Sequence, residues 1–276
     1  MSDTEHDGLF GPDSVAWRVV GHPASLIGGM RALILQSLHP LAMAGVAQHS
    51  DYRARSLDRL RRTAAYVLTT TFGTTAEAHA AADTVRRVHR RVRGTDPVTG
   101  RPYSAEDPDT QLWVHCVEWH SFLAAYRAYG GGLSPADQDR YIAEGARVAG
   151  LLDVPEDSVP HSVAEQREYF EQVRPQLCVS EQARGAIDFV LDPPLTRDLL
   201  HLQVPLRIVS RAALAITPRD LRRMAGIDGP RPIDGLTVAA VRPAAAALTL
   251  PLLRDAPRLV LGSQALAVAR EARRAA

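Results

Sequence analysis

The chain has 276 residues, enough to bury a sizeable core, and its 32 basic and 31 acidic residues give a net charge of +1. This balance shows none of the basic bias of proteins that bind nucleic acid or anionic membranes. Aromatic residues make up only 5% of the chain, and alanine and leucine supply most of its apolar mass, which favours helices over strands.

The N-terminal residues are not expected to form a signal peptide. Residues 1–14 are polar and acidic and lack a basic segment followed by an apolar one. Residues 1–11 are expected to be disordered, and Ser14 is expected to cap a short helix around Trp17. The apolar run from Ala24 to Val46 is interrupted by polar residues and a proline, so we expect no membrane span and a cytoplasmic protein.

Helical patterns fill the next part of the chain. Helices are predicted over residues 25–37, 40–48, 55–72 and 76–92. The third of these is amphipathic, with apolar residues recurring at spacings of three and four. Gly73 ends that helix, and Thr74 or Thr75 caps the next.

The second half continues the helical pattern after a break. Residues 94–110, rich in glycine, proline and aspartate, are predicted to be a functional loop in which Tyr103 borders a substrate entrance. Further helices are expected after Asp107 and over residues 134–152, 163–173, 181–189, 204–215, 218–225, 238–248 and 257–275. The sequence therefore predicts an all-α fold, a single globular multi-helix domain over residues 12–276.

The basic side chains of this chain are arginines, apart from its histidines. No lysine is present to act as a base or to form a Schiff base. Arg59, Arg62 and Thr63 share one face of a predicted helix at positions i, i+3 and i+4. They form either a functional cluster or a solvated basic stripe.

His89 lies near the end of a predicted helix, with Arg93 one turn later. Its ring could bind a metal or haem iron through one nitrogen. The alternative is a helix-terminal histidine stabilised by the negative end of the helix dipole.

A second group of histidines lies on the helix after Asp107. His115 and Glu118 are one turn apart and could share a metal, whereas His120 points elsewhere. A buried polar cluster beside tryptophans is the alternative. His39 and His49 bracket the helix over residues 40–48, where they line a pocket or cap helix ends.

The two cysteines, Cys116 and Cys178, are too few for a disulfide framework or a structural zinc site. We interpret them as buried or idle thiols in a reducing compartment, with one bridge or a ligand role as the alternative. No nucleotide-binding, serine-hydrolase or zinc-protease motif occurs.

Four segments in fixed order resemble a known family. "LHPLAMAGVAQHS", "RLRRT", "VHRRVRG" and "GRPYSAEDPDTQLWVH" are similar to segments of the rubber oxygenases (latex clearing proteins) and the mpaB oxygenases. The similarity runs from about Trp17 to about Ala240. Each segment alone is weakly specific, and the ordered combination carries the resemblance.

This resemblance implies a b-type haem in a buried cavity of the helical core. His89 would be the proximal iron ligand, and Arg93 would lie near the haem. Arg59, Arg62 and Thr63 would lie in the distal pocket or beside the propionates. Arginine suits this place because its guanidinium binds carboxylates in a bidentate manner.

One residue departs from the rubber oxygenases, which place a lysine where this chain has Arg62. Arginine keeps its proton, so it cannot act as a base. It can still stabilise a developing negative charge. This argues against polyisoprene cleavage and favours a smaller organic substrate.

The sequence therefore predicts a haem b-dependent oxygenase or oxidase. Its substrate would be a small, largely apolar metabolite, with dioxygen or peroxide as oxidant, and homo-oligomer formation is left open. One alternative is a haem-binding protein without turnover. Another is a non-haem metal oxidoreductase using His115, Glu118 and His120.

Overall fold

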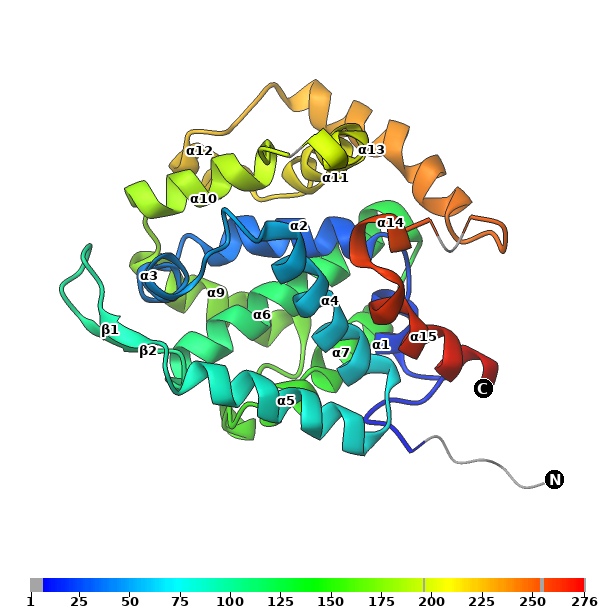
Figure 1. Ribbon diagram of the computed structural model, residues 1–276, viewed down its shortest axis with the longest axis horizontal. Helices are drawn as coiled ribbons and strands as arrows, with labels where there is room; N and C mark the ends of the chain where they lie inside the picture. The colour runs from blue at the N-terminus through cyan, green and yellow to red at the C-terminus, as the bar shows by residue number, and fades with distance from the viewer. Residues whose placement is uncertain (1–6, 196, 254–255, 276) are drawn as a thin grey trace.

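A computed structural model describes residues 7–195, 197–253 and 256–275 of the chain. Nearly all regular structure in this part is helical, and the one sheet is a two-stranded antiparallel hairpin (Figure 1). The prediction of an all-α single domain is confirmed.

The first half of the chain supplies the helices that surround the interior. These are α1 (Val15–Val20), α2 (Ser25–Gln36), α3 (Pro40–His49), α4 (Ser56–Phe72), α5 (Thr75–His89) and α6 (Pro108–Ala125). The strands β1 (Arg93–Thr95) and β2 (Pro102–Ser104) lie between α5 and α6.

The second half begins with a π-helical turn, η1 (Tyr126–Gly130), and continues with shorter helices. The α-helices are α7 (Pro135–Glu144), α8 (Ala146–Gly150), α9 (Val163–Val173), α10 (Glu181–Leu191), α11 (Gln203–Ala215), α12 (Arg219–Ala225), α13 (Arg231–Ala247), α14 (Arg258–Leu261) and α15 (Ser263–Ala275). The 3-10 turns are η2 (Glu156–Ser158), η3 (Arg174–Gln176) and η4 (Arg197–Leu202).

Capping side chains set the helix starts where the sequence predicts them. The hydroxyl of Ser14 accepts a hydrogen bond from the Trp17 amide, and the carboxylate of Asp107 accepts one from the Thr110 amide. Thr74 forms a complete capping box with Glu77 at the start of α5. These local bonds explain why the starts of α1, α5 and α6 agree with the prediction to within about two residues.

Some boundaries differ from the prediction. The helix expected over residues 257–275 is divided at Gly262, whose φ of 82° lies in the left-handed region. Helix α13 begins seven residues earlier than expected and contains Pro243. Residues 7–11 are not disordered, because Phe10 is 1% exposed and Gly8 forms a β-bridge with Thr74. The rest of the predicted disordered segment, residues 1–6, lies outside the described residues.

The segment predicted as a loop contains the β1–β2 hairpin, which projects from the body of the molecule (Figure 1). Its strands have only three residues each, too few to show a recognisable alternation. Tyr103 is buried at the base of the hairpin and donates a hydrogen bond of 2.9 Å to Oε1 of Gln48. It therefore fastens the hairpin to α3 and does not stand at an entrance.

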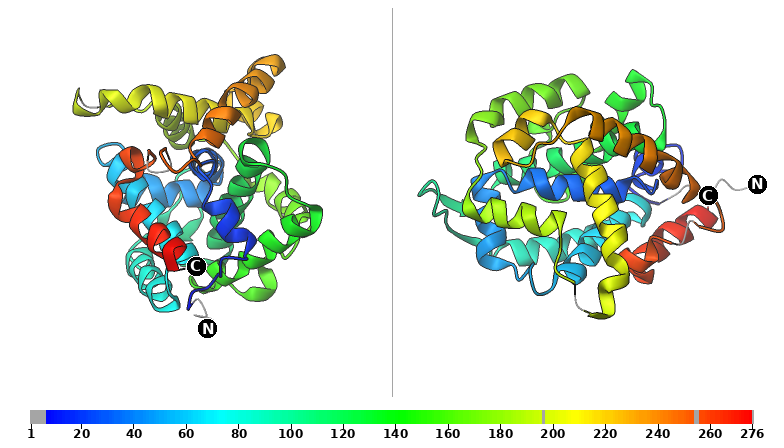
Figure 2. Two further views of the ribbon diagram at one scale, coloured as in Figure 1. Left: turned by 90° about the vertical axis from the view of Figure 1, so that its right-hand side faces the viewer. Right: turned by 90° about the horizontal axis from the view of Figure 1, so that it is seen from above.

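The elements are stacked around α2, which packs along α6 in the centre of the molecule. Helices α10, α11, α12 and α13 lie above α2, and the α4–α5 hairpin lies below it (Figures 1 and 2). The core contains buried side chains from α1, α2, α4, α6 and α7. As the apolar pattern of residues 25–37 predicts, α2 is buried along most of its length.

No single helix of the described chain is long and apolar enough to cross a membrane. Leu199–Ala215 and Arg219–Ala225 pass the same test only as a pair bent by 116°.

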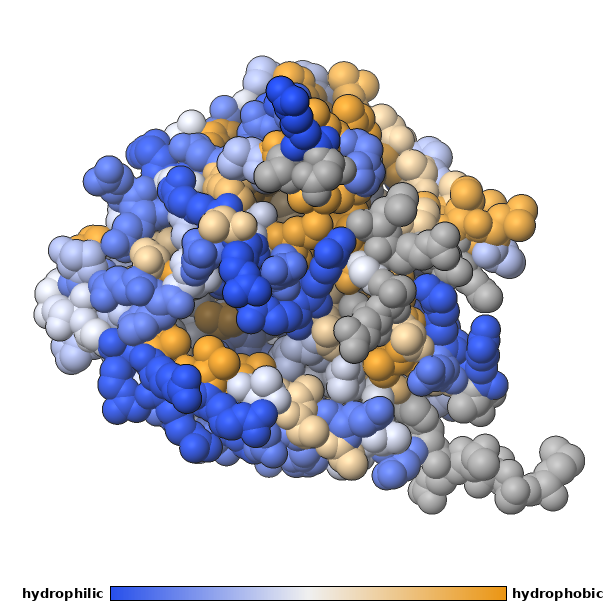
Figure 3. All heavy atoms as spheres, in the orientation of Figure 1, coloured by the Kyte–Doolittle hydropathy of each residue, from blue (hydrophilic) through white to orange (hydrophobic). Residues whose placement is uncertain are grey.

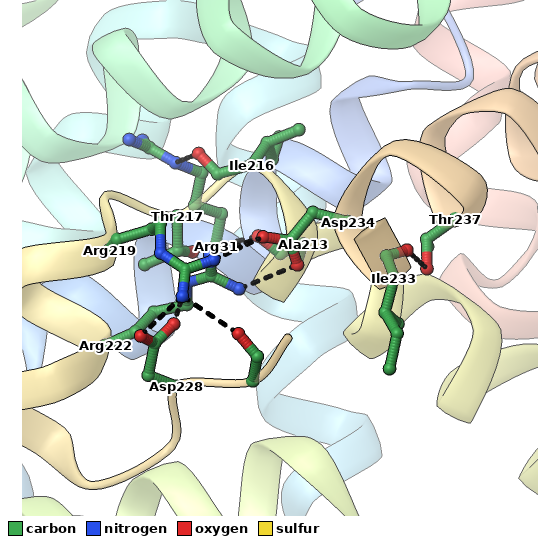
Figure 4. Close-up of polar contacts among 11 residues, drawn as sticks. Arg31, Ala213, Ile216, Thr217, Arg219, Arg222, Asp228, Ile233, Asp234 and Thr237 are labelled. Atoms are coloured by element: carbon green, nitrogen blue, oxygen red, sulfur yellow. Dashed lines mark hydrogen bonds and ion pairs between the residues drawn. The ribbon is translucent and has the colours of Figure 1, made fainter. Parts of the chain in front are cut away.

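A buried charge cluster ties α12 to the start of α13 (Figure 4). Arg222 is 2% exposed and donates to both carboxylate oxygens of Asp234, at 2.9 and 2.6 Å. Arg219 pairs with Asp228 at 2.8 Å and with Asp234 at 3.4 Å. The cluster is neutral, which compensates for the loss of water around the guanidinium of Arg222.

Breaking this cluster should destabilise the fold. Asp234→Asn removes one charge and leaves the Arg222 guanidinium buried with a single carboxylate. We expect the free energy of unfolding to fall by about 3 kcal/mol, measured by chemical denaturation. The matched control is Asp192→Asn, which breaks the Arg207–Asp192 pair, whose side chains are 51% and 60% exposed. That change should cost less than about 1 kcal/mol. Equal losses in the two variants would contradict this assignment.

Candidate functional site

A hollow lies between the α4–α5 hairpin and α6. The backbones of α4 and α5 contact each other closely, and α6 packs mainly on α2. The C-terminal half of α4 also contributes Val67 and Phe72 to a buried cluster that includes Trp119 of α6. Figure 3 shows the hollow on the outer surface, above α5 and beside α4, with apolar atoms at its floor. A concave, mostly apolar space of this kind is the usual form of a ligand site.

One stripe of α6 faces this space. Leu112, Trp113 and Cys116 are buried, as are most residues of the helix. Gln111, His115 and Glu118 keep some accessible surface although α6 is central in the fold. Their spacing of four and three residues places them on a common face of the helix. We therefore assign this face to the hollow.

We assign one stripe of α4 to the opposite side of the hollow. Arg59, Thr63 and Tyr66 also follow a spacing of four and three residues, with Arg62 beside them. Tyr66 lies deepest, packed near Ala82 of α5, and its hydroxyl is buried without a hydrogen-bond partner. Arg62 and Thr63 are exposed. The stripe thus runs from the rim of the hollow into the interior.

His89 ends α5, and the antiparallel hairpin places it level with the start of α4. Neither ring nitrogen makes a hydrogen bond within the described residues, and Nδ1 is buried. Burial lowers the pKa of His89, and the negative charge of Glu106 only partly opposes this effect. The imidazole is therefore neutral at pH 7 and has a free nitrogen lone pair, as a metal ligand requires.

The contacts of the other histidines show which of them have a ring nitrogen free to bind a metal or haem iron. Hydrogen bonds through a ring nitrogen hold four of them: His22, His39, His49 and His120. Three are exposed: His79, His161 and His201. Within the described chain, only His89 and His115 are both shielded from solvent and free of hydrogen bonds. His39 and His49 therefore serve the structure, the first as the cap of α3.

His115 and Glu118 lie together on α6, but His120 does not join them. The guanidinium of Arg31 on α2 donates to Nδ1 of His120 at 3.2 Å. Arg31 also binds the carbonyl oxygen of Ile216, as Figure 4 shows. Among the described residues, no three histidine, cysteine or carboxylate side chains converge as a metal site. The non-haem metal hypothesis therefore lacks its third ligand.

Burial controls the protonation of the α6 stripe. It lowers the pKa of His115 to about 4, and it raises the pKa of Glu118 to about 7. The His115 ring also stacks on Trp119, with centroids 5.5 Å apart. The hollow thus contains a neutral imidazole and a carboxyl group that can exchange a proton near neutral pH.

The structure places the predicted arginines in two groups. Arg59 is half-buried at the His89 end of the hairpin, and its guanidinium donates to the Ser50 hydroxyl. Burial and the charge of Arg62 lower the pKa of Arg59. Arg93 is 65% exposed and is held by the Arg90 carbonyl and by Glu106. Arg59 and Arg62 therefore lie on α4 with their charges close to each other, whereas Arg93 is engaged by the Arg90 carbonyl and Glu106.

Sequence reasoning missed three polar side chains with buried, unpartnered atoms. They are Tyr66, Gln111 and Tyr141. Extending the Arg59–Thr63 pattern by three residues would have found Tyr66. No local pattern identifies Tyr141, which reaches this region from α7. The cysteines are free, as predicted, with Cys116 buried and Cys178 partly so.

Because the pKa of Glu118 is raised, replacing its carboxyl group should increase the free energy of unfolding by an amount that depends on pH. The unfolded chain releases this proton near pH 4.5 and the folded chain near pH 7, so folding stability falls between these values and stays reduced above them. Glu118→Gln should therefore be more stable than the parent by about 3 kcal/mol at pH 8 and equal to it near pH 4. Denaturant titrations at both pH values measure this, with the exposed Glu171→Gln as control. A gain that is independent of pH would refute the explanation.

The comparison with family models agrees with the family that the order of motifs indicates. Residues 17–249 match the model described as "ER-bound oxygenase mpaB/B'/Rubber oxygenase, catalytic domain". No curated protein and no solved structure gives a significant match to the chain. The match covers most of the chain, including α4, α5 and α6. The chain therefore belongs to the mpaB and rubber oxygenase catalytic-domain family, a family of oxygenases.

Proposed function

We propose that this protein is a haem b-dependent oxygenase or oxidase that acts on a small, largely apolar organic molecule with dioxygen or peroxide. The observation that supports it most directly is His89, a partly buried, neutral imidazole at the end of α5 that forms no hydrogen bond with any described residue. A side chain of this kind is costly to keep in a fold unless it binds something.

The residues present fit a haem group. A free ring nitrogen of His89 suits the iron, and the apolar floor of the hollow suits the flat macrocycle (Figure 3). Arg59 and Arg62 lie on α4, the partner of α5 in the hairpin, so they would pair with the propionates or face the open side of the iron. Arg93 is the weaker partner because it is already paired with Glu106. When bound, haem supplies the activation of dioxygen or peroxide.

The chain's own side chains would prepare the site for this chemistry. Arg62 forms no hydrogen bond or ion pair with any described residue, so its charge is available at the rim. It cannot release its proton, so it would hold anionic groups and not act as a base. Thr63, beside it, offers a hydroxyl that can orient water or substrate.

The size and polarity of the hollow bear on the substrate. Its floor is apolar, which suits an apolar molecule (Figure 3). Arg62 in place of the lysine of the rubber oxygenases supports the same conclusion.

Haem binding should depend on His89. His89→Ala should lose most of its haem after reconstitution with haemin, measured by the Soret band and by the pyridine haemochrome. His115→Ala is the matched control, because His115 is the other shielded histidine without hydrogen bonds. It should retain haem. If His89→Ala keeps full haem with an unchanged spectrum while His115→Ala loses it, the ligand is His115.

Arg62 should affect either the affinity for haem or the binding of ligands to its iron, without coordinating the iron itself. If its charge faces the open side of the iron, Arg62→Ala keeps the haem and weakens cyanide binding roughly 10- to 100-fold. If it pairs with a propionate, the same variant loses haem affinity instead. Arg62→Lys should restore most of either property. Cyanide titrations and haem-transfer rates of the three proteins separate the two roles. A variant unchanged in both measurements would make Arg62 a surface residue.

A further inference from the structure

Helix α13, in the layer above α2, is apolar on its inner and its outer face. The inner face packs on α11 and η1 and includes Val238, Val241 and Ala245. Most of the other residues of α13 are exposed, and helical periodicity places them together on the outer face. A surface helix of a globular protein normally has a polar outer face, and one that is apolar all round is covered by something other than water.

The exposed residues of α13 include no acid, amide or hydroxyl side chain. Leu236 is 69% exposed, Ile233 is exposed beside it, and alanines and prolines continue the same face. The exposed charged residues of the helix are Arg231 and Arg242. Because their separation is close to three helical turns, these two arginines lie along one edge of the apolar face.

The apolar surface continues beyond the end of the helix. Residues 248–253 form turns in which Leu250, Leu252 and Leu253 are exposed, and Leu252 is 95% exposed. Figure 3 shows apolar atoms along the upper right edge of the molecule, where Figure 1 places α13 and the segment after it. Contiguous exposed apolar residues of this kind mark interaction sites. We call the outer face of α13 together with residues 248–253 the α13 surface.

The charges around the α13 surface are positive. Residues 203–253 contain seven arginines and three aspartates, whereas the rest of the chain has 25 basic and 28 acidic residues. All three aspartates are already paired with arginines. Arg211, Arg223, Arg231 and Arg242 are exposed and form no hydrogen bond or ion pair with any described residue. This part of the fold therefore has cations that are available to an anionic partner.

The charge pattern distinguishes between two partners that could cover an apolar surface. A second copy of the chain would present the same surface, which has no unpaired carboxylate to offer the arginines. The interface of a lipid bilayer presents acyl chains to apolar side chains and phosphate groups to guanidinium groups. The α13 surface therefore complements an anionic bilayer and not a second copy.

We propose that the α13 surface docks on the headgroup region of a bilayer that contains anionic lipids. Helix α13 would lie parallel to the bilayer plane, with Ile233 and Leu236 at the boundary of the acyl chains and Leu252 inserted at its end. Arg231 and Arg242 would bind lipid phosphates along one edge of the helix. The docking involves neither His89 nor haem, so it stands or fails independently of the proposed function.

Cosedimentation of the full chain with lipid vesicles tests this proposal. One set of vesicles would contain phosphatidylcholine, and the other an equal mixture of phosphatidylcholine and phosphatidylglycerol. We expect the mixed vesicles to bind the chain at least about tenfold more tightly, and high salt to weaken this binding. Leu252→Asp should weaken binding to the mixed vesicles about tenfold or more, and Arg242→Glu several-fold. Both residues are exposed, so the melting temperature should not change.

The matched control is Val98→Asp, which places the same charge on an exposed apolar residue of the β1–β2 hairpin. The hairpin lies at the other end of the molecule from residues 248–253, so this variant should bind like the parent (Figures 1 and 2). Equal binding to both kinds of vesicle, binding to neither, or full binding by Leu252→Asp would each overturn the proposal. A dimer in sedimentation velocity that Leu236→Asp dissociates, without vesicle binding by the parent, would identify a second copy as the partner instead.

Discussion

The position of the α4–α5 hairpin depends on contacts with distant parts of the chain. Helix α15 packs along α4, and α1 supports its inner end. The first described residues bridge to Thr74 at the turn of the hairpin. On α5, Arg86 donates a 2.7 Å hydrogen bond to the Leu151 carbonyl. These contacts hold the hairpin beside α6, and Val67 and Phe72 of α4 share a buried apolar cluster with Trp119 of α6.

This arrangement explains why polar side chains occur where a core would be expected. In an ordinary helical bundle, positions such as 111, 115 and 118 of α6 would carry apolar residues that fill the layer. Here they carry an amide, an imidazole and a carboxyl group. Such groups lower stability unless something binds them, so their retention in a central helix argues for function. The same reasoning applies to the Tyr66 hydroxyl on the facing helix.

Local rules could predict the helices but not the space between them. The starts of α1, α5 and α6 depend on a capping side chain within three residues, so the sequence revealed them. The β1–β2 hairpin depends on Tyr103 reaching Gln48 on α3, a contact between residues 55 apart in the chain. The start of α13 depends on Arg222 and Asp234 in the same way. Tertiary contacts of this kind override local propensity, and the sequence pattern does not contain them.

The residues of the candidate site also fall into those that the sequence could identify and those that it could not. The order of motifs groups Arg59, Arg62 and His89, and the two helices of one antiparallel hairpin carry all three. Tyr66 and Tyr141 come from different helices, and their hydroxyls are buried without a hydrogen-bond partner only in the folded chain. Helical periodicity places a side chain on one face of its helix, but it does not say which element covers that face. The unpartnered hydroxyls therefore depend on tertiary packing that the sequence pattern does not contain.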